Sequence, residues 1–215
     1  MQGHGFATNV ICGAAIVLAF TVTAPAQNNR SFVATTGNDA NNCSASAYCR
    51  TFAAALAVTN PGGEIVEVNS GGYGPATITQ PVVITAVGVD ASITATSGNG
   101  LTINTAGNVT ITGLNLHGGG TGSVGVEVQA VGFLRLYSMQ IENFVNYGVD
   151  FPAGGNLAIY DSKINDCGGA GLNVRNAAAK AYVHNTAFDN DNIAGALAND
   201  GGMLAIADSS RALQS

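Results

Sequence analysis

The 215-residue chain is acidic and sparsely charged, with 7 basic against 13 acidic side chains and a formal net charge of −6. The basic residues are few and form no cluster, which argues against a nucleic-acid partner, because such binding depends on neutralising phosphates. Beyond the amino terminus no apolar run approaches the roughly 20 residues that a membrane-spanning helix needs. The length suits one domain, and the charge favours a cationic ligand or calcium over a polyanion.

The amino-terminal segment has the pattern of a secretory signal. Residues 10–22 are an apolar run of 13, too short to anchor the chain in a membrane, and residues 24–26, Ala-Pro-Ala, match the small-x-small pattern of a cleavage site. The positive charge that usually precedes such a run is missing. We expect residues 1–26 to be a signal peptide, so that the mature protein is secreted or periplasmic and has no membrane span.

Cysteine usage agrees with export. Cys43 and Cys49 bracket a five-residue polar loop, and in an oxidising compartment we expect them to form a disulfide. The alternative is a pair of free thiols in a loop. Cys167 has no partner left in the exported chain and no basic neighbour in the sequence, which is more typical of a small buried residue than of a nucleophile.

A helix-like segment follows this loop. Residues 51–59 (Thr-Phe-Ala-Ala-Ala-Leu-Ala-Val-Thr) are rich in helix formers and end at Asn-Pro-Gly-Gly. Phe52, Leu56 and the alanines would cover the start of the repeats that come next, because a stack of strands exposes both core and strand edges at its end. We therefore predict a disulfide loop and an N-terminal capping helix over residues 27–62, and a loop over residues 71–75.

A short pattern then returns five times before Ser209. Each repeat opens with Gly-φ-x-φ, where φ is an apolar residue, and the successive steps are 25, 23, 23 and 24 residues. The five opening glycines are Gly100, Gly125, Gly148, Gly171 and Gly195. A fixed period in this range is typical of a solenoid, in which each unit buries its apolar face against its neighbours.

Inside each repeat two further φ-x-φ segments follow the first. Alternation with period two places one side chain inside and the next outside, so each repeat is predicted to contain three very short strands and no helix. A leucine-rich repeat has a similar period, but it needs leucines at fixed spacing and a helical segment, and neither is present. The sequence thus predicts an all-β fold, a three-sided parallel β-helix over residues 63–215. Its last coil loses the third strand and shows no cap, as if the end were truncated or covered by a partner or a second copy.

The minimal second turn of each repeat has one position in common down the stack. This position holds Gly113, Ser138, Asp161, Asn185 and Asp208. Small polar side chains there can bond one another or the turn backbone from coil to coil.

The order of these features resembles a known family. Residues 43–56 (Cys…Cys-Arg-Thr-Phe-Ala-Ala-Ala-Leu), residues 61–68 and the Gly-φ-x-φ coils are similar to right-handed parallel β-helix proteins of the pectate-lyase-like superfamily, and closer still to small secreted bacterial members of unestablished role. The resemblance implies a right-handed helix and a polysaccharide as the substrate class, because the family's enzymes are lyases, hydrolases and epimerases. Their catalytic signatures are absent; residues 147–152 echo the epimerase motif without its histidine.

On enzymes of this fold the substrate groove usually follows the outer face of the first strand. The outward column of that strand holds Thr102, Glu127, Asp150 and Asn173. Stacked strands lie about 4.8 Å apart, so Glu127 and Asp150 would be neighbours, with Arg175 within two coils. Two such carboxylates can divide acid and base roles or bind a divalent cation. The alternative is a solvated polar face on which Arg175 merely offsets the negative charge.

A second column lies at the end of the second strand. It holds Thr112, Tyr137, Tyr160 and His184, beside Arg135 and Tyr182. Outward aromatic rings in a row suit sugar rings, and His184 could act as a base; the alternative is a ladder that only stabilises the sheet. The candidate glycan-binding residues are Tyr137, Tyr160, Arg135 and Asn173.

Two segments echo calcium-binding loops, residues 189–192 and residues 168–173, and both are better explained as turns. No metal site or cofactor is predicted, with calcium left open. The favoured interpretation is a secreted β-helix module that binds a polysaccharide or cell-surface glycan, or displays a surface, without catalysis. The alternative is a polysaccharide lyase, hydrolase or epimerase that uses Glu127, Asp150, Arg175 or His184.

Overall fold

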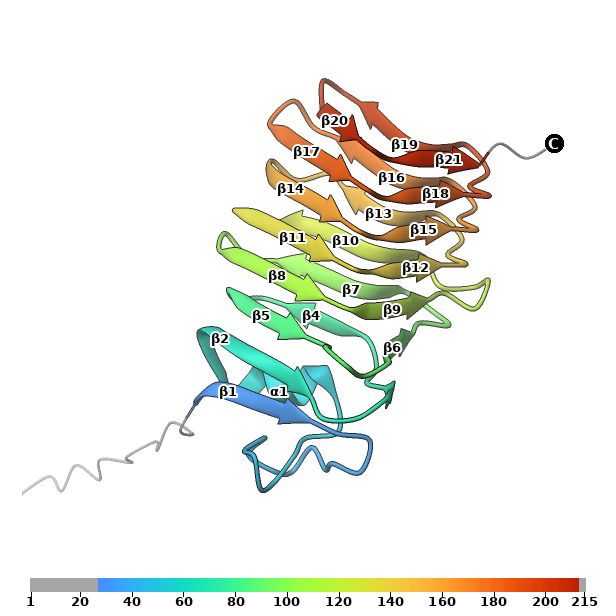
Figure 1. Cartoon of the computed structure of the whole chain (residues 1–215). Coiled ribbons are helices and arrows are strands. Elements are labelled where there is room, and N and C mark those ends of the chain that lie inside the picture. The colour runs from blue at the N-terminus through green and yellow to red at the C-terminus, as the bar shows by residue number, and fades with distance from the viewer. Residues whose placement is uncertain (1–26, 213–215) are drawn as a thin grey trace, which may run out of the picture.

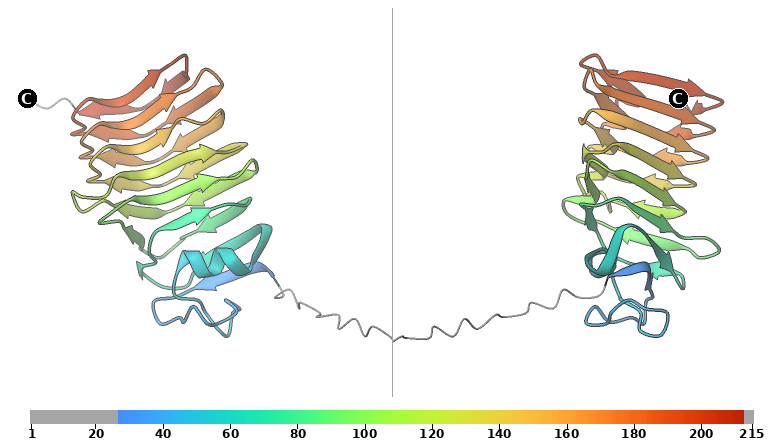
Figure 2. Two further views of the ribbon diagram at one scale, coloured as in Figure 1. Left: turned by 180° about the vertical axis from the view of Figure 1, so that it is seen from behind. Right: turned by 90° about the vertical axis from the view of Figure 1, so that its left-hand side faces the viewer.

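The protein is a right-handed parallel β-solenoid with three faces, described here by a computed structural model that covers residues 27–212. The chain climbs coil by coil from the N-terminal end, blue in Figure 1, to the C-terminal end, red in Figure 1. Figure 2 shows the same stack from behind and from the side. The predicted signal peptide, residues 1–26, lies outside the described residues. Within residues 27–212 no helix has the length and apolar character to cross a membrane.

Three parallel sheets form the faces. The eight-stranded sheet contains β1 (Asn28–Val33), β2 (Thr59–Glu67), β5 (Val82–Thr85), β8 (Asn108–Thr112), β11 (Phe133–Tyr137), β14 (Gly155–Tyr160), β17 (Ala179–His184) and β20 (Met203–Ala207). The six-stranded sheet contains β4 (Ala76–Ile78), β7 (Asn99–Asn104), β10 (Val124–Ala130), β13 (Tyr147–Phe151), β16 (Ala170–Arg175) and β19 (Ala194–Asn199). The seven-stranded sheet contains β3 (Gly71–Gly72), β6 (Ala91–Thr94), β9 (Leu114–His117), β12 (Gln140–Glu142), β15 (Lys163–Asn165), β18 (Ala187–Asp189) and β21 (Ser210–Ala212).

The predicted register of the coils is confirmed. In one middle coil Val126 aligns with Leu101 and Val149, Leu136 with Ile111 and Ile159, and Ile141 with Leu116 and Ile164. All nine side chains are buried. The apolar columns therefore fill the interior of the solenoid, and the alternate residues form its outer faces.

The glycine that opens each coil is required by close packing of successive coils. A Cβ atom at Gly148 would stand 2.7 Å from the carbonyl oxygen of Gly171 and 2.3 Å from Cγ2 of Ile164. Gly125 meets the carbonyl oxygen of Gly148 in the same way, at 2.5 Å. A side chain at either glycine would force neighbouring coils apart.

The second turn of each coil is also as expected. Its common position is in the left-handed region, with φ of 78°, 51°, 52°, 46° and 49° for Gly113, Ser138, Asp161, Asn185 and Asp208. Glycine, asparagine and aspartate tolerate this conformation best. The Nδ2 of Asn185 donates to Oδ1 of Asp161 at 2.7 Å, so neighbouring turns are linked.

The N-terminal cap matches its prediction. Helix α1 (Phe52–Val58) begins after Thr51, whose hydroxyl accepts a hydrogen bond from Ala54 N–H at 3.2 Å, and it buries Phe52 and Leu56. Cys43 and Cys49 form the disulfide. Figure 1 shows the helix and the disulfide loop closing the end below β2.

Three expectations for the ends of the fold were wrong. Residues 28–33, placed in the cap region, form β1 and extend the eight-stranded sheet. In the predicted loop 71–75, β3 pairs with β6, and Tyr73 is buried against Phe52 with ring centroids 5.3 Å apart. The last coil keeps its third strand, since β21 pairs with β18.

Candidate functional site

A polar cluster occupies the outer face of the six-stranded sheet, where the carboxylate column was predicted. Asp150 on β13 aligns with Glu127 on β10 and with Asn173 on β16. Arg175 reaches back along the stack and contacts both oxygens of Asp150, with Nε–Oδ1 and Nη2–Oδ2 distances of 3.0 and 2.6 Å. Asn173 donates to Oδ1 at 2.9 Å. The structure therefore brings Glu127, Asp150, Asn173 and Arg175 together.

This cluster differs from the expected solvated face. Asp150 and Asn173 are each only 2% exposed although their side chains face outward. Arg175 lies against Asp150. Asn173 also accepts a hydrogen bond from Asn199 at 3.2 Å. Both side chains are occupied by neighbouring coils, which makes Asn173 a poor candidate for glycan contact.

Glu127 is the member of the cluster with proton chemistry to offer. Burial raises its pKa above the ordinary value, the nearby carboxylate of Asp150 raises the pKa further, and Arg175 partly offsets both. The hydrogen bonds with Asp150 raise the pKa of Arg175 in turn. Glu127 thus keeps its proton to a higher pH than an ordinary glutamate does, whereas Asp150 is the ion-pair partner of Arg175.

The aromatic column lies on the eight-stranded sheet, with Thr112, Tyr137, Tyr160 and His184 aligned on successive strands. The rings of Tyr137 and Tyr160 are stacked, with centroids 5.0 Å apart and an interplanar angle of 10°. Their faces therefore cover each other, as in a sheet-stabilising ladder. Tyr182 is tilted by 56° to Tyr160 and is 38% exposed, so it offers the more accessible ring.

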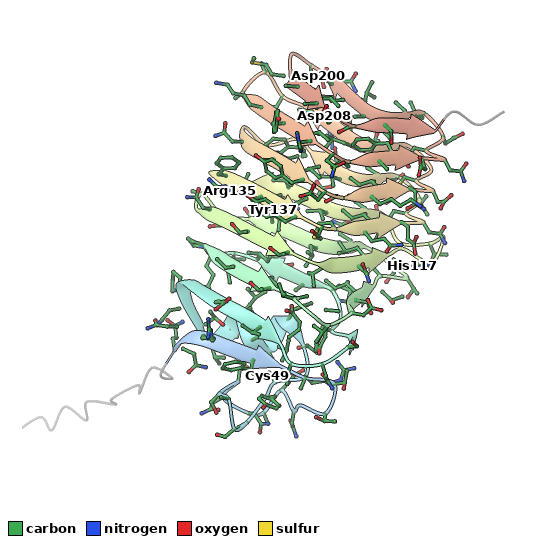
Figure 3. All side chains as sticks on the ribbon, in the orientation of Figure 1. Cys49, His117, Arg135, Tyr137, Asp200 and Asp208 are labelled. Atoms are coloured by element: carbon green, nitrogen blue, oxygen red, sulfur yellow. A yellow bond between two sulfur atoms is a disulfide. The ribbon has the colours of Figure 1, made fainter. Side chains whose placement is uncertain are left out.

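Two basic candidates lie along the same sheet. The guanidinium carbon of Arg135 lies 3.7 Å from the ring centroid of Phe133, and Figure 3 shows Arg135 close to Tyr137. The Nε2 of His184 lies 3.3 Å from Oδ2 of Asp208 in the next coil. Because His184 is on a different sheet from Glu127, the four proposed catalytic residues do not form one site.

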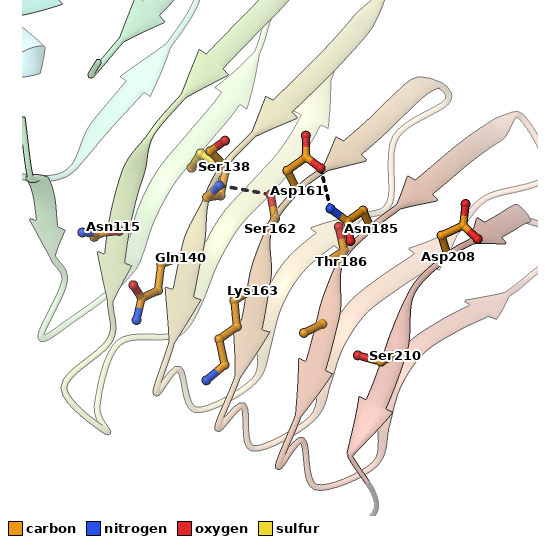
Figure 4. Close-up of a pocket in the computed structure, with 12 residues that line it drawn as sticks. Asn115, Ser138, Gln140, Asp161, Ser162, Lys163, Asn185, Thr186, Asp208 and Ser210 are labelled. Carbon is orange, nitrogen blue, oxygen red and sulfur yellow. Dashed lines mark hydrogen bonds between the residues drawn. The ribbon is translucent and has the colours of Figure 1, made fainter. Parts of the chain in front are cut away.

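A polar groove of about 380 Å³ lies over the turn residues that directly follow the aromatic column in sequence, and none of the column's rings lines it (Figure 4). It follows the corner between the eight- and seven-stranded sheets and passes over successive coils. Its charged and amide side chains are Asn115, Gln140, Asp161, Lys163, Asn185 and Asp208. The repeat pattern of the turn residues predicts only a ladder between coils, and the groove also needs the outward column of the third strand. Following that column through Asn115, Gln140 and Lys163 would have indicated the groove.

Of the two calcium-loop echoes, residues 190–192 and 168–169 lie in turns between coils, whereas Asp189 ends β18 and residues 170–173 belong to β16. Oδ1 of Asp191 accepts a hydrogen bond from the N–H of Cys167 at 3.0 Å, and Asn192 donates to Gly168 C=O at 3.1 Å. Cys167 is buried, which raises its pKa to about 12, with the nearby Asp191 adding to the effect. In the described part of the chain no three His, Cys, Asp or Glu side chains gather as a metal site would require.

Comparison with known proteins supports the architecture. A family model described as "Right handed beta helix region" matches residues 58–210. This range begins at the end of α1 and reaches β21, so it includes strands of all three sheets. No curated protein and no solved structure matches the chain.

Proposed function

The chain belongs to the right-handed beta helix family, and from this premise we propose that it is an exported bacterial module that binds glycan along one corner of the solenoid without catalysis. The polar groove beside the aromatic column carries the proposal. Export is supported by the Cys43–Cys49 disulfide, which persists in oxidising compartments, and by the signal-like pattern of residues 1–26.

The groove has the chemistry that glycan recognition needs. Its amide, hydroxyl and carboxylate groups can bond sugar hydroxyls. The exposed ring of Tyr182, on β17 but outside the groove lining, offers a flat apolar surface with a polar tip. Asp161, Asp208 and Lys163 all line the groove, so its charge is mixed. Because the groove crosses several coils, an extended chain can lie along it. A neutral polysaccharide fits this mixed charge better than a polyuronate does.

The test compares two tyrosines with different surroundings. Tyr182→Ser should weaken retention on the bound glycan roughly five- to tenfold, equivalent to about 1 kcal/mol, and leave the melting temperature unchanged, since this ring is exposed. Tyr137→Ser should lower the melting temperature, because it removes a stacked partner of Tyr160. Tyr147→Ser, on the six-stranded sheet, is the matched control. Affinity electrophoresis against neutral, acidic and amino polysaccharides, with calcium and with chelator, provides the readout. Unchanged retention of Tyr182→Ser on every glycan would contradict the proposal.

The alternative is a polysaccharide lyase, hydrolase or epimerase, and one observation favours it. Glu127 has a raised pKa beside Asp150 and Arg175, on the face that such enzymes use. Against it, Asp150 is buried and already accepts three hydrogen bonds. Turnover of any glycan in the same panel that Glu127→Gln abolishes would establish the enzyme and reject the non-catalytic module.

A further inference from the structure

The polar groove contains two carboxylates, Asp161 and Asp208, that follow its turn column. Oδ1 of Asp161 accepts a hydrogen bond from Nδ2 of Asn185 at 2.7 Å. Among the described residues, no lysine, arginine or histidine lies within ion-pair distance of Asp161. Asp208 meets the imidazole of His184, with an Nε2–Oδ2 distance of 3.3 Å. Asp161 therefore carries a charge in the groove that no cation of this part of the chain offsets.

The lysine of the groove directs its charge elsewhere. Figure 4 shows that the side chain of Lys163 extends away from the carboxylates of Asp161 and Asp208. Its Nζ lies 3.8 Å from Oδ2 of Asp189, which does not line the groove. The positive charge of Lys163 is thus offset outside the groove, and the turn column within the groove is negative.

The backbone of these turns does not require the negative charge. Asp161, Asn185 and Asp208 adopt the left-handed conformation, with φ of 52°, 46° and 49°, and asparagine tolerates this conformation as aspartate does. Asn185 occupies the same column with a neutral side chain. The two carboxylates therefore add a charge that the turn conformation does not need, and a cationic ligand in the groove would use it.

The spacing of the two carboxylates suits a repeating ligand. Stacked strands lie about 4.8 Å apart, so Asp161 and Asp208, two coils apart in the column, are separated by roughly 10 Å. This is close to the length of two sugar units in an extended chain. In a chain whose successive units face opposite sides, every second unit presents the same substituent to the groove. The side chains of Asn185 and Thr186, between the two carboxylates, can bond neutral hydroxyl groups.

Resting on the glycan-binding function proposed above, we propose that the groove takes a polysaccharide of amino sugars with free ammonium groups. Asp161 and Asp208 each accept charge-assisted hydrogen bonds from one ammonium group, and the groups between them contact the intervening sugar unit. An N-acetylated amino sugar offers no positive charge to these carboxylates, and a uronate is repelled by them. Charge complementarity at exposed groups contributes specificity more than affinity.

The test compares two probes that differ only in acetylation, a chitosan hexamer and its fully N-acetylated counterpart. Isothermal titration calorimetry with the full chain measures the Kd of each hexamer at low and at high salt. We expect the wild type to bind the chitosan hexamer roughly three- to tenfold more tightly at low salt, as two exposed ion pairs allow. The preference should shrink at high salt, because exposed charges are screened.

Three variants locate the preference. Asp161→Asn and Asp208→Asn suit the left-handed turn and remove one charge each, so each should reduce the ratio of the two Kd values, and the double variant should abolish the preference. Asp200→Asn is the matched control. Asp200 is also exposed and left-handed, with φ of 50°, but it lies outside the groove, in the turn between β19 and β20. Its loss changes the net charge equally and should leave the ratio unchanged.

The outcomes separate this inference from the proposed function. A wild type that binds the acetylated hexamer at least as tightly overturns the amino-sugar specificity and leaves the glycan-binding module in place. Binding of neither hexamer by a protein that retains another glycan does the same. A preference that survives in the double variant, or that Asp200→Asn weakens equally, also overturns the inference, since the groove would not explain it. Retention of no glycan in either experiment overturns both proposals.

Discussion

Two carboxyl groups are withdrawn from water in this solenoid, and they meet opposite conditions. Asp150, in the middle of the stack, accepts three hydrogen bonds from Asn173 and Arg175 of the next coil. Glu67, at the end of β2, is 4% exposed, and neither of its oxygens accepts a hydrogen bond from another residue. Its strand partner is Val33. A buried carboxyl group is thus stabilised where the residues above or below it in the stack donate hydrogen bonds to it. An apolar neighbour such as Val33 cannot donate one to Glu67.

The largest loss of stability should come from removing the cation of the paired group. Arg175→Met leaves Asp150 buried without its counter-ion, and should lower the free energy of unfolding by roughly 2 to 4 kcal/mol, because an unpaired buried charge is costly. Because the Arg175 guanidinium is partly solvated, we expect a loss in the lower part of this range. Urea unfolding at pH 7 measures it. The control is Arg135→Met, which removes a guanidinium stacked on Phe133 and should cost under about 1 kcal/mol. Equal losses of stability in the two variants would contradict the special role of the Arg175–Asp150 pair.

The unpaired carboxyl group of Glu67 should make the stability of the protein depend on pH. Burial raises the pKa of Glu67 from 4.5 to about 8, with Glu64 adding to the effect. The unfolded chain therefore loses this proton before the folded protein does, so wild-type stability falls as pH rises from about 4.5 and levels off above about 8.

Glu67→Gln should abolish this fall. The advantage of the variant over the wild type should grow by roughly 3 to 4 kcal/mol between pH 5 and pH 8, at about 1.4 kcal/mol per pKa unit. Thermal unfolding across the pH range is the measurement, with Glu142→Gln on the surface as the control. Parallel pH profiles for Glu67→Gln and the wild type would show that Glu67 is solvated or paired.

The smallest effect should come from Glu127, which lies between the two extremes. Its pKa is raised by burial and by Asp150, so it opposes folding as pH rises through that pKa. Glu127→Gln should stabilise the protein slightly at pH 7, by under about 1 kcal/mol because the group is partly solvated, and not at pH 3. The melting temperatures of the wild type and Glu127→Gln at pH 7 and at pH 3 measure this difference. A loss of stability at pH 7 would mean that Glu127 makes a favourable contact as an ion.

Periodicity predicted the solenoid because it depends only on residue spacing. The alignment of Glu127 with Asp150, or of Tyr137 with Tyr160, follows from counting along the repeat. Burial of Asp150 could not be predicted in this way, since it depends on the path of the Arg175 side chain. Residues 28–33 were missed because their pairing with β2 crosses the whole disulfide loop and no repeat marks it.

The groove was missed for a related reason. It exists because the left-handed residue of each second turn sets two sheets at an angle, and spacing within one strand contains no information about that angle. The turn column itself was predicted from Ser138, Asp161 and Asn185. That Lys163 lines the same groove as these turn residues could be seen only from the three-dimensional corner.

The hydrogen bonds between the disulfide loop and β1 make the first strand edge sensitive to redox conditions. As long as Cys43 and Cys49 are joined, the loop is held against the backbone of Phe32. In a reducing environment the loop would lose its covalent restraint and could leave the β1 edge. An uncovered strand edge is a template for pairing with another chain. Oxidation of one short loop would then protect the first strand from aggregation.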